Sequence, residues 1–513
     1  MRDIVNKSLK LNNDLDRYVE QALEQGRPVK IGWGRAGDER PKDGEFGVMT
    51  HLPEGARVLC LGSLGDCVGA ANRGGTLTLR GDCGSMLGAF HLSGKTVVEK
   101  DVGNKAGFAM NGGEISIQGS TGDESGHSMA GGILLVRGHS GDRLGCGMSG
   151  GSIVVMGSVG SEPGIGMTGG RVIISGSCPP PPDGVQMRSI KKSEISEFSK
   201  LLDPMGLSLN DDALVLEPTE DAFASVEEAE YFISECFENI SLYPNEDSLS
   251  NNAPLDHYTL LVQDGSDSGG ALLKIPWIVT CETTMGSERW KGVDSPAIVR
   301  TESRDNDLLL VGKNEFCEAI DHVGNCSGIV FDITDFPGLN DAEIEAMVIS
   351  LRSRMSESSI ILLRGRIDRI ERLFRLVMDF ELDGAIVNCA TRSGSRLASS
   401  LPKIGLASKA MGMSETGKFV MIEVLHEPVA KDLIIAVASG CTALVSPCPE
   451  SDLNEKINEL TMGIRGWMRE IGVDRIERIG RRNLRANDFD TAAISGLRLV
   501  GYGRPLKMWL DLR

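Results

Sequence analysis

A 19-residue period between Gly62 and Gly176 restricts the fold of this chain more than any other feature. Columns of glycine and methionine recur at this spacing, and each period also carries one short run of aliphatic or β-branched residues. A fixed period with one strand per unit predicts a β-solenoid, in which each coil buries its apolar face against its neighbours. The columns are Gly75, 94, 113, 132, 151 and 170; Gly65, 84, 103, 122, 141 and 160; Gly69, 88, 107, 126, 145 and 164; Gly62, 81, 119, 138, 157 and 176, interrupted at Lys100; and Met110, 129, 148 and 167.

The glycine and methionine columns have different physical explanations. Glycine at a coil corner permits positive φ or close approach of backbone, which a side chain would oppose in every coil. We expect the methionines to form a flexible apolar ladder inside the solenoid, although a metal- or ligand-binding stripe is the alternative. Phosphate binding by the glycines is not favoured, because no glycine run ends in the Lys-Ser/Thr of a P-loop.

The composition excludes several classes of protein. The formal net charge of −19 argues against a nucleic-acid-binding surface. No apolar stretch approaches the length of about 18 residues that a membrane span needs, and the first residues lack the apolar core of a signal peptide. The 12 cysteines include no Cys-x-x-Cys pair, so we predict no metal site. Because no export signal is seen, we predict a cytoplasmic location, and an anaerobic or reducing cell would tolerate this number of reduced thiols.

The pattern along the chain predicts five segments. Residues 1–45 are a lead-in with a helix from Asn13 or Asp14 to Gln25 and a strand at 28–33 that closes the solenoid. The repeat occupies residues 46–180 and ends at four prolines. Residues 181–270 are a helical linker, with helices over 191–203 and about 225–239 and a loop or linker over 240–270.

Residues 271–453 alternate between apolar strands and amphipathic helices, and residues 454–513 add helices and a tail. Such alternation predicts a parallel sheet, either doubly wound or a (β/α)8-type barrel that is incomplete or begins with an irregular strand. Seven strands are expected, at 272–280, 308–311, 328–333, 359–364, 384–389, 419–425 and 443–446, with helices that include 341–355 and 370–380.

The repeat resembles the glycine-repeat (GXGXG) domain of the glutamate synthase large subunit and is similar to the small repeat-bearing component of formylmethanofuran dehydrogenase. The resemblance covers about residues 45–180 and implies a right-handed single-stranded β-helix of 19-residue coils that acts as a spacer and docking surface for other subunits. Residues 328–500 also resemble the FMN-binding barrel of glutamate synthase, through Asp432 and the segments 383–399, 401–407, 438–445 and 471–484.

Departures from that family pattern bear on the cofactor. Arg364 stands at the place of the family's lysine beside the flavin ring. The segment 423–429 contains Glu423 and Pro428 where the family has a glycine-rich phosphate turn, and only Cys448 stands at the iron–sulfur cluster positions. We therefore predict a degenerate barrel. FMN is the candidate cofactor, although the family's phosphate loop and lysine are not present. The glutaminase half of glutamate synthase, with its N-terminal cysteine nucleophile, is absent from this sequence.

Several residues at the carboxyl ends of the expected strands are candidates for a site, because ligands of α/β folds bind there. The loop containing Arg392, Ser393, Gly394 and Ser395, together with Arg364, is the candidate anion- or cofactor-binding site. Four other groups are candidates, each with a plainer alternative. Asp332 and Asp335 could contribute to a site or could cap a helix, and Glu423, His426 and Glu427 could form an acid/base or metal cluster or could be ordinary surface residues. Cys441 and Cys448 could be ligands or buried thiols, and the 285–287 segment faintly resembles the family's flavin loop.

Three hypotheses of function follow. The first is a non-catalytic scaffold subunit of a cytosolic redox or amidotransferase-type complex that binds other protein subunits through its β-helix. The second is an oxidoreductase or transferase of glutamate synthase type that depends on flavin or another anionic ligand. The third is a structural subunit of a formylmethanofuran dehydrogenase-like complex. The sequence identifies no catalytic residues.

Overall fold

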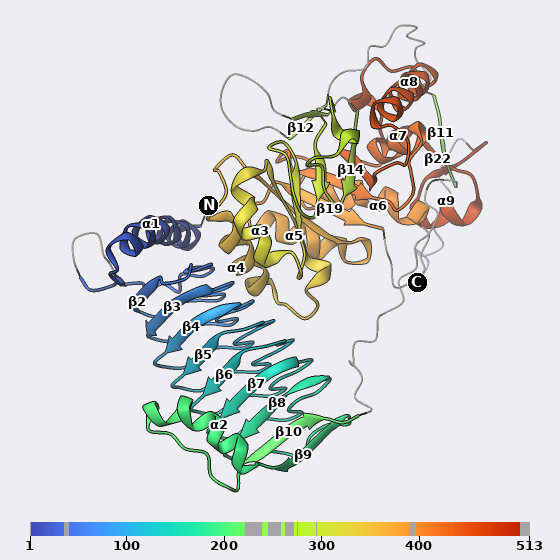
Figure 1. Ribbon diagram of the computed structural model, residues 1–513. Coiled ribbons are helices and arrows are strands. Elements are labelled where there is room, and N and C mark those ends of the chain that lie inside the picture. Colours follow the sequence, from blue (N-terminus) through green and yellow to red (C-terminus); the bar gives the residue numbers. More distant parts are fainter. Residues whose placement is uncertain are drawn as a thin grey trace. The chain divides into compact units, whose positions relative to one another are not determined.

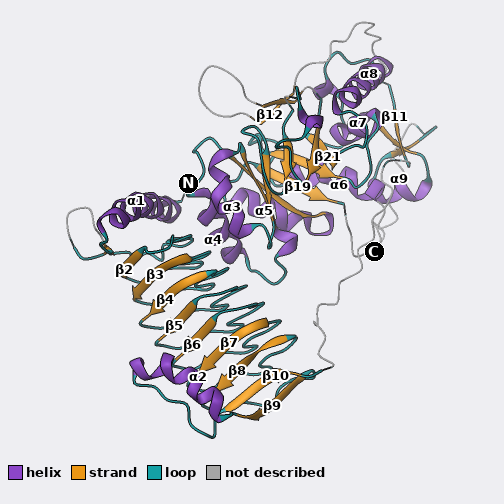
Figure 2. Cartoon of the chain, viewed as in Figure 1, coloured by secondary structure: helices purple, strands orange, loops and turns teal. Residues whose placement is uncertain are grey.

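The computed structural model describes residues 2–34, 40–220, 237, 239–244, 258–261, 271–273, 275–293, 295–389 and 397–502. The chain forms two compact units, one of residues Met1–Glu228 with Leu339–Arg354 and the other of Ala229–Gly338 with Met355–Arg513. Strands dominate the first unit, whereas helices and strands alternate in the second (Figure 2). No helix among the described residues has the length and apolar character needed to cross a membrane.

A 10-stranded sheet with the order β1-β2-β3-β4-β5-β6-β7-β8-β10-β9 organises the first unit (Figure 1). The strands from β2 to β8 are parallel, and neighbours pair residues 19 positions apart, as in Val58 with Leu77 and Leu134 with Ile153. A second ladder of single bridges, from Leu64–Cys83 to Ser140–Val159, repeats the same offset between the strands. The expectation of one strand per period is therefore confirmed. The strands are β1 Val29–Ile31, β2 Arg57–Leu61, β3 Arg73–Arg80, β4 Ser93–Val98, β5 Glu114–Ile117, β6 Ile133–Val136, β7 Ser149–Val155, β8 Gly169–Ile174, β9 Val185–Ser189 and β10 Leu214–Pro218.

The glycine columns serve both of the purposes expected of them. Gly132 has φ +84°, and a Cβ there would lie 2.5 Å from Met110 Cε and 2.8 Å from the backbone carbon of Gly112. Gly141 belongs to a column without positive φ, but its Cβ would lie 2.8 Å from the Asp123 backbone nitrogen. From Gly94 onward the first column therefore needs glycine for its backbone conformation as well as for space, and the second column needs it for space alone.

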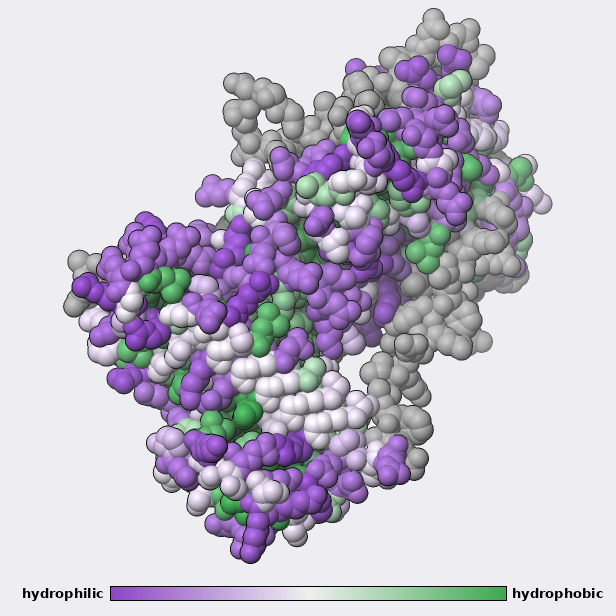
Figure 3. Space-filling view, in the orientation of Figure 1, coloured by the Kyte–Doolittle hydropathy of each residue, from purple (hydrophilic) through white to green (hydrophobic). Residues whose placement is uncertain are grey.

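The methionine column lines the interior of the repeat, as predicted. Met110, Met129 and Met148 are fully buried, Met167 is 1 % exposed, and all four belong to the same apolar core as the inward residues of β2–β8. The outer surface of the coils differs, because a pale band of intermediate hydropathy covers the stacked coils in Figure 3, as expected for exposed glycine, serine and threonine.

The start of the repeat is covered by α1, Asp3–Gln25, and by β1, which pairs with β2. The prediction that Asn13 or Asp14 begins the helix is wrong, because the helix continues back to Asp3. The Asn12 side chain is buried within it, donates to the Gly47 carbonyl and accepts from the Met49 amide. Helix α4, Asp341–Arg352, also belongs to this unit, where Lys105 Nζ lies 2.7 Å from Glu343 Oε2.

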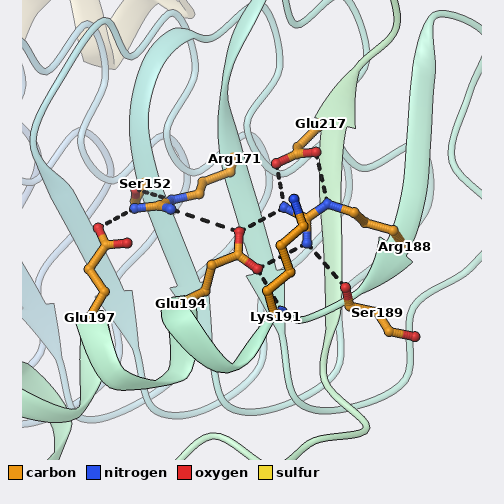
Figure 4. A network of polar contacts seen from close by, with 8 residues as sticks. All are labelled: Ser152, Arg171, Arg188, Ser189, Lys191, Glu194, Glu197 and Glu217. Atoms are coloured by element: carbon orange, nitrogen blue, oxygen red, sulfur yellow. Dashed lines mark hydrogen bonds and ion pairs between the residues drawn. The ribbon is translucent and has the colours of Figure 1, made fainter.

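The outer face of the sheet near its other end is covered by α2, Lys192–Leu202, which confirms the helix predicted over 191–203. Phe198 and Leu202 pack against Leu135, Val154 and Ile173, which point away from the interior of the repeat. A polar network joins this helix to β9 and β10 (Figure 4). Arg188 bonds both Glu194, at 2.7 and 2.9 Å, and Glu217, at 2.9 Å from its Nε, so α2 is held to the last two strands by charge as well as by apolar contacts.

Eight parallel strands, β14 to β21, form a closed barrel in the second unit. The first and last strands pair directly, with Ile278 opposite Val445. The (β/α)8-like prediction is thus supported, and the doubly wound and incomplete alternatives are wrong. The strands are β14 Trp277–Cys281, β15 Ala297–Val299, β16 Leu308–Val311, β17 Gly328–Asp332, β18 Ile360–Arg366, β19 Gly384–Asn388, β20 Phe419–Glu423 and β21 Ala443–Pro447.

Two strand predictions in this region need correction. Sequence reasoning missed β15, because only three apolar residues lie between Pro296 and Arg300. The strand expected at 272–280 is two elements, β13 (Ala271–Leu273), which pairs with β12 (Tyr258–Leu261), and β14. The expected linker over 240–270 also contains β11, Ile240–Leu242, paired with β22, Leu484–Ala486. The helix predicted at 225–239 falls almost entirely outside the described residues.

Helices follow six of the barrel strands in the chain. α4 and α5 match the two helices predicted between residues 341 and 380 within a few residues at their ends. A short strand, β23 (Arg498–Leu499), pairs with β22 after the last helix. The helices are α3 Phe316–His322, α4, α5 Ile370–Asp379, α6 Leu397–Ala410, α7 Ala430–Ala438, α8 Leu453–Ile471 and, after β22, α9 Phe489–Ser495.

Candidate functional site

The interior of the barrel is apolar for most of its height and becomes polar at the carboxyl ends of the strands. Its apolar cluster contains Val330 of β17, Leu362 of β18, Ile386 of β19 and Met421 of β20. Two residues further along each strand, on the same inward face, come four polar side chains. They are Asp332, Arg364, Asn388 and Glu423.

These four side chains form one hydrogen-bonded network. Arg364 Nε lies 2.6 Å from Glu423 Oε2 and its Nη2 lies 3.0 Å from Oε1, which is a bidentate pair across two strands. The remaining guanidinium nitrogen, Nη1, donates to Asp332 Oδ2. Asn388 Nδ2 donates to Glu423 Oε2 at 3.0 Å. All three nitrogens of the guanidinium therefore bind carboxylates of the barrel itself.

The network is buried and carries two carboxylates for one guanidinium. Asp332, Asn388 and Glu423 are at most 8 % exposed. Burial opposes the charge of Arg364, but Asp332 and Glu423 outweigh it, so the pKa of Arg364 is raised. The other oxygen of Asp332 accepts from the Thr334 amide at 3.0 Å and hydroxyl at 2.7 Å. Its charge is thus compensated from two sides, and each nitrogen of the guanidinium donates one hydrogen bond to a carboxylate of the barrel.

A second group of charges follows β15, β16 and β17 at the same end. Arg300 Nη1 lies 2.9 Å from Glu315 Oε1. Partial desolvation and the nearby carboxylates of Asp332 and Glu315 raise the pKa of Asp335. Gly312 lies beside both of these acids, since a Cβ there would lie 2.7 Å from Glu315 Oε2. This part of the rim is therefore acidic, with Arg300 paired to one of its carboxylates.

The loops after β20 and β21 are where a (β/α)8 barrel commonly binds phosphate, at helix N-termini. In this chain a carboxylate occupies each of these helix ends. Asp432 accepts from the Val429 amide at 3.0 Å at the start of α7. Asp452 accepts from the amides of Asn454 and Glu455, at 2.9 and 3.0 Å, at the start of α8. These residues do not fit the phosphate group of FMN, because they bring negative charge and use the amides that would bind it.

Of the five residues predicted for an anion site, the structure describes Arg364. Arg364 lies at the carboxyl end of β18, as expected, but is committed to Asp332 and Glu423. The other four predicted binding residues, Arg392, Ser393, Gly394 and Ser395, lie outside the described residues, so their role stays a prediction.

The predicted acid/base or metal cluster of Glu423, His426 and Glu427 is wrong in its geometry. Glu423 points into the barrel, His426 Nε2 lies 3.6 Å from Asp432 Oδ2, and Glu427 Oε1 lies 2.7 Å from Lys456 Nζ. No group of three histidine, cysteine or carboxylate side chains in the described part of the chain is arranged to hold a metal. The three residues diverge because only the first lies on the inward face of β20.

Asn388 is the network residue that sequence reasoning missed. The signal was available in part: Asn388 ends a run of apolar strand residues at the same strand position as Asp332. The pairing of Arg364 with Glu423 was not foreseeable from the sequence, because the residues are 59 positions apart and belong to strands that are not neighbours.

Comparison with known proteins gives one family match. Residues 46–202 match the model of the GXGXG motif family, which supports a glutamate synthase-type repeat in this part of the chain. No curated protein sequence matches the chain.

Solved structures share a distant likeness with it. A mutant flavocytochrome b2 with benzoylformate is 12 % identical, with a TM-score of 0.37 over 53 % of this chain and 80 % of that one. A mutant of an active chimera of (S)-mandelate dehydrogenase is 14 % identical, with a TM-score of 0.30 over 48 % of this chain and 88 % of that one. At these values the likeness carries no inference about binding or activity.

Proposed function

We propose that this chain is a non-catalytic assembly subunit whose repeat region is a right-handed single-stranded β-helix of the glutamate synthase type. In this proposal the β-helix binds other protein subunits of a redox or amidotransferase-type complex in the cytoplasm. The barrel serves as a structural body and does not bind flavin. The match to the GXGXG motif family over residues 46–202 supports the assignment of the repeat.

The observation that carries the proposal is the closed network around Arg364. A catalytic or ligand-binding cation at the mouth of a barrel has to offer hydrogen-bond donors to the ligand. Each guanidinium nitrogen of Arg364 donates to Asp332 or Glu423, and these two buried carboxylates outnumber the one cation, so the layer as a whole disfavours an incoming anion. Asp432 and Asp452 at the starts of α7 and α8 add support, because they disfavour a phosphate at both helix ends.

Flavin binding to the purified full-length protein is the decisive test. The protein is isolated from its native host without added cofactor, its absorbance spectrum is recorded, and FMN is then titrated while flavin fluorescence is followed. The proposal predicts a colourless protein and no saturable binding up to about 100 μM FMN. This concentration is well above the dissociation constant expected for a resident cofactor. Stoichiometric flavin in the isolated protein, or saturable binding, would overturn it.

The assembly part of the proposal has a separate readout. Mass photometry of the natively isolated protein is expected to give a mass above that of the 55.0 kDa chain, with partner subunits in fixed stoichiometry. Recovery of the chain alone, or only as copies of itself, under several mild isolation conditions would contradict an assembly role even if flavin is absent.

A second candidate function is an oxidoreductase or transferase that uses flavin or another anionic ligand. The observation in its favour is the polar layer itself, since Asp332, Arg364, Asn388 and Glu423 lie where enzymes with this barrel place their reactive groups. In that case Arg392→Ala and Ser393→Ala would lower turnover of the purified assembly by tenfold or more, whereas a scaffold would keep its full activity. A structural subunit of a formylmethanofuran dehydrogenase-like complex would give the scaffold result and differ in its partners.

A further inference from the structure

Two cysteines lie side by side where the barrel closes. We call the paired edges of β14 and β21 the barrel seam, since these are the first and last of its eight strands. Thr280 pairs with Pro447 in this seam, and the Cys448 amide donates to the Thr280 carbonyl at 3.0 Å, which continues the ladder by one residue. Cys281 and Cys448 are therefore adjacent across the seam at its carboxyl end.

The two side chains point to the same face of the sheet. Ile278 and Val445 lie inside the barrel, and Cys281 and Cys448 each follow three positions later, so both point outward. Neighbouring strands are separated by about 4.8 Å, which falls inside the Cα–Cα range of about 4.4–6.8 Å that a disulfide requires. Both residues are half-buried, so a small reagent can reach them from the surface.

The surroundings make the two thiols unequal. Burial raises the pKa of Cys281 to about 12, with a further contribution from Cys448. Burial also raises the pKa of Cys448, but the Arg289 guanidinium opposes it. Arg289 is held there by a bond to the Ser451 carbonyl at 3.1 Å and another to the Pro449 carbonyl. Cys448 is thus the thiol more readily converted to the attacking thiolate.

We propose that Cys281 and Cys448 form a reversible disulfide across the barrel seam by exchange with a low-molecular-weight disulfide such as oxidised glutathione. The Cys448 thiolate attacks one sulfur of the small disulfide, which releases one thiolate and leaves a mixed disulfide on Cys448. Cys281 then loses its proton to solvent, attacks Sγ of Cys448 and releases the second small thiolate. Two protein thiols are oxidised and one small disulfide is reduced, so electrons balance.

The bond would join the two strands whose pairing closes the barrel. Because the cross-link encloses the whole segment between Cys281 and Cys448, it restricts the unfolded chain over a long loop. The oxidised barrel is therefore expected to unfold at a temperature several degrees higher than the reduced barrel. This inference is independent of whether the protein is a scaffold or an enzyme.

Peptide mapping of the full-length protein tests the proposal. The protein is equilibrated in glutathione buffers from fully reducing to fully oxidising, free thiols are blocked, and disulfide-linked peptides are measured by mass spectrometry. A peptide linking Cys281 to Cys448 that appears with oxidation and disappears with dithiothreitol is expected, together with the rise in unfolding temperature. Absence of the linked peptide at every ratio would overturn the proposal.

Variants and a second reagent separate this outcome from general thiol oxidation. Cys281→Ser and Cys448→Ser should each abolish the temperature shift, whereas Cys317→Ser, at another partly exposed cysteine of the same unit, should keep it. Phenylarsine oxide, which bridges neighbouring thiols, should bind the unmodified reduced protein with a loss of two free thiols. If the two seam variants bind it as well as the unmodified protein does, the seam is not the reactive pair. The loss of two free thiols when phenylarsine oxide binds the unmodified protein remains a test even if a variant fails to fold.

Discussion

The repeat region and the barrel are both built from parallel strands, yet they enforce that arrangement in different ways. In the repeat, each strand pairs with one 19 residues away, and inward positions such as Ile115, Leu134 and Ile153 stay aliphatic in successive coils. In the barrel, the pairing that completes the fold joins β14 to β21, more than 160 residues apart, and the polar layer carries a different residue on each of the strands β17 to β20. The repeat depends on local regularity and the barrel on closure.

This difference determines how a substitution acts in each region. A glycine of the repeat is constrained by the coil next to it, so its environment is known once one period is understood. Arg364 in the barrel is constrained by Asp332 and Glu423, which reach it from two other strands. A substitution in the repeat should therefore act through sterics, and one in the barrel layer through uncompensated charge.

Gly132→Val should give the largest loss of stability. A β-branched side chain at φ +84° has to be accommodated 2.8 Å from the backbone carbon of Gly112, so we expect a loss of about 4–6 kcal/mol in the free energy of unfolding. Gly147→Val is the matched control, because Gly147 has φ +61° but its nearest neighbour for a Cβ is Ser128 Oγ at 3.9 Å. It should lose only the conformational part, about 1–3 kcal/mol. Equal losses in chemical denaturation would refute the steric explanation.

Arg364→Met should destabilise the barrel by about 3–5 kcal/mol, because it leaves the buried Asp332 and Glu423 without a cation. The combined variant Asp332→Asn, Arg364→Met, Glu423→Gln removes the charges together and should recover most of that loss. Urea unfolding followed by the fluorescence of Trp277 and Trp290, both buried in the second unit, measures the effect. A combined variant as unstable as the single one would show that shape and not charge decides this layer.

The network of Figure 4 makes the first unit sensitive to acid. The Arg188 guanidinium holds the pKa of Glu194 at about 2, below its ordinary value of 4.5. This lowered pKa contributes stability that is complete above pH 4.5 and is lost as the pH falls from 4.5 toward 2. Glu194→Gln should be less stable at neutral pH and show a flatter dependence in that range. Glu197→Gln, at an exposed ion pair with Arg171, should keep the slope of the unmodified protein.

Met129→Leu should have the smallest effect, a loss of less than about 1.5 kcal/mol, because the two side chains are similar in volume and the site is apolar and fully buried. Thermal unfolding of the full-length protein is sufficient to measure it. A loss above about 3 kcal/mol would indicate that the methionine sulfur has a role beyond packing, such as the ligand-binding alternative for this column.

The sequence by itself predicted the repeat in detail, because a solenoid coil contacts only the coils one period before and after it. The spacing of Gly132 and Gly151 already states which residues are stacked, and the burial of Met129 follows from its column. The same reasoning missed the true start of α1. The polar residues near position 12 suggested a helix start, but the Asn12 side chain lies within the helix and bonds to Gly47 and Met49, which are distant in the sequence.

In the barrel, the sequence predicted most of the strands and the helices α4 and α5, because alternation of apolar and amphipathic segments is a local property. It predicted a (β/α)8-like barrel but left a doubly wound sheet open, and it missed β15, whose three residues are too short to give a pattern. Only the tertiary structure brought Asp332, Arg364, Asn388 and Glu423 together and turned His426 away from them. The reason is that inward direction and strand order, neither of which a local pattern contains, decide which side chains meet inside a closed barrel.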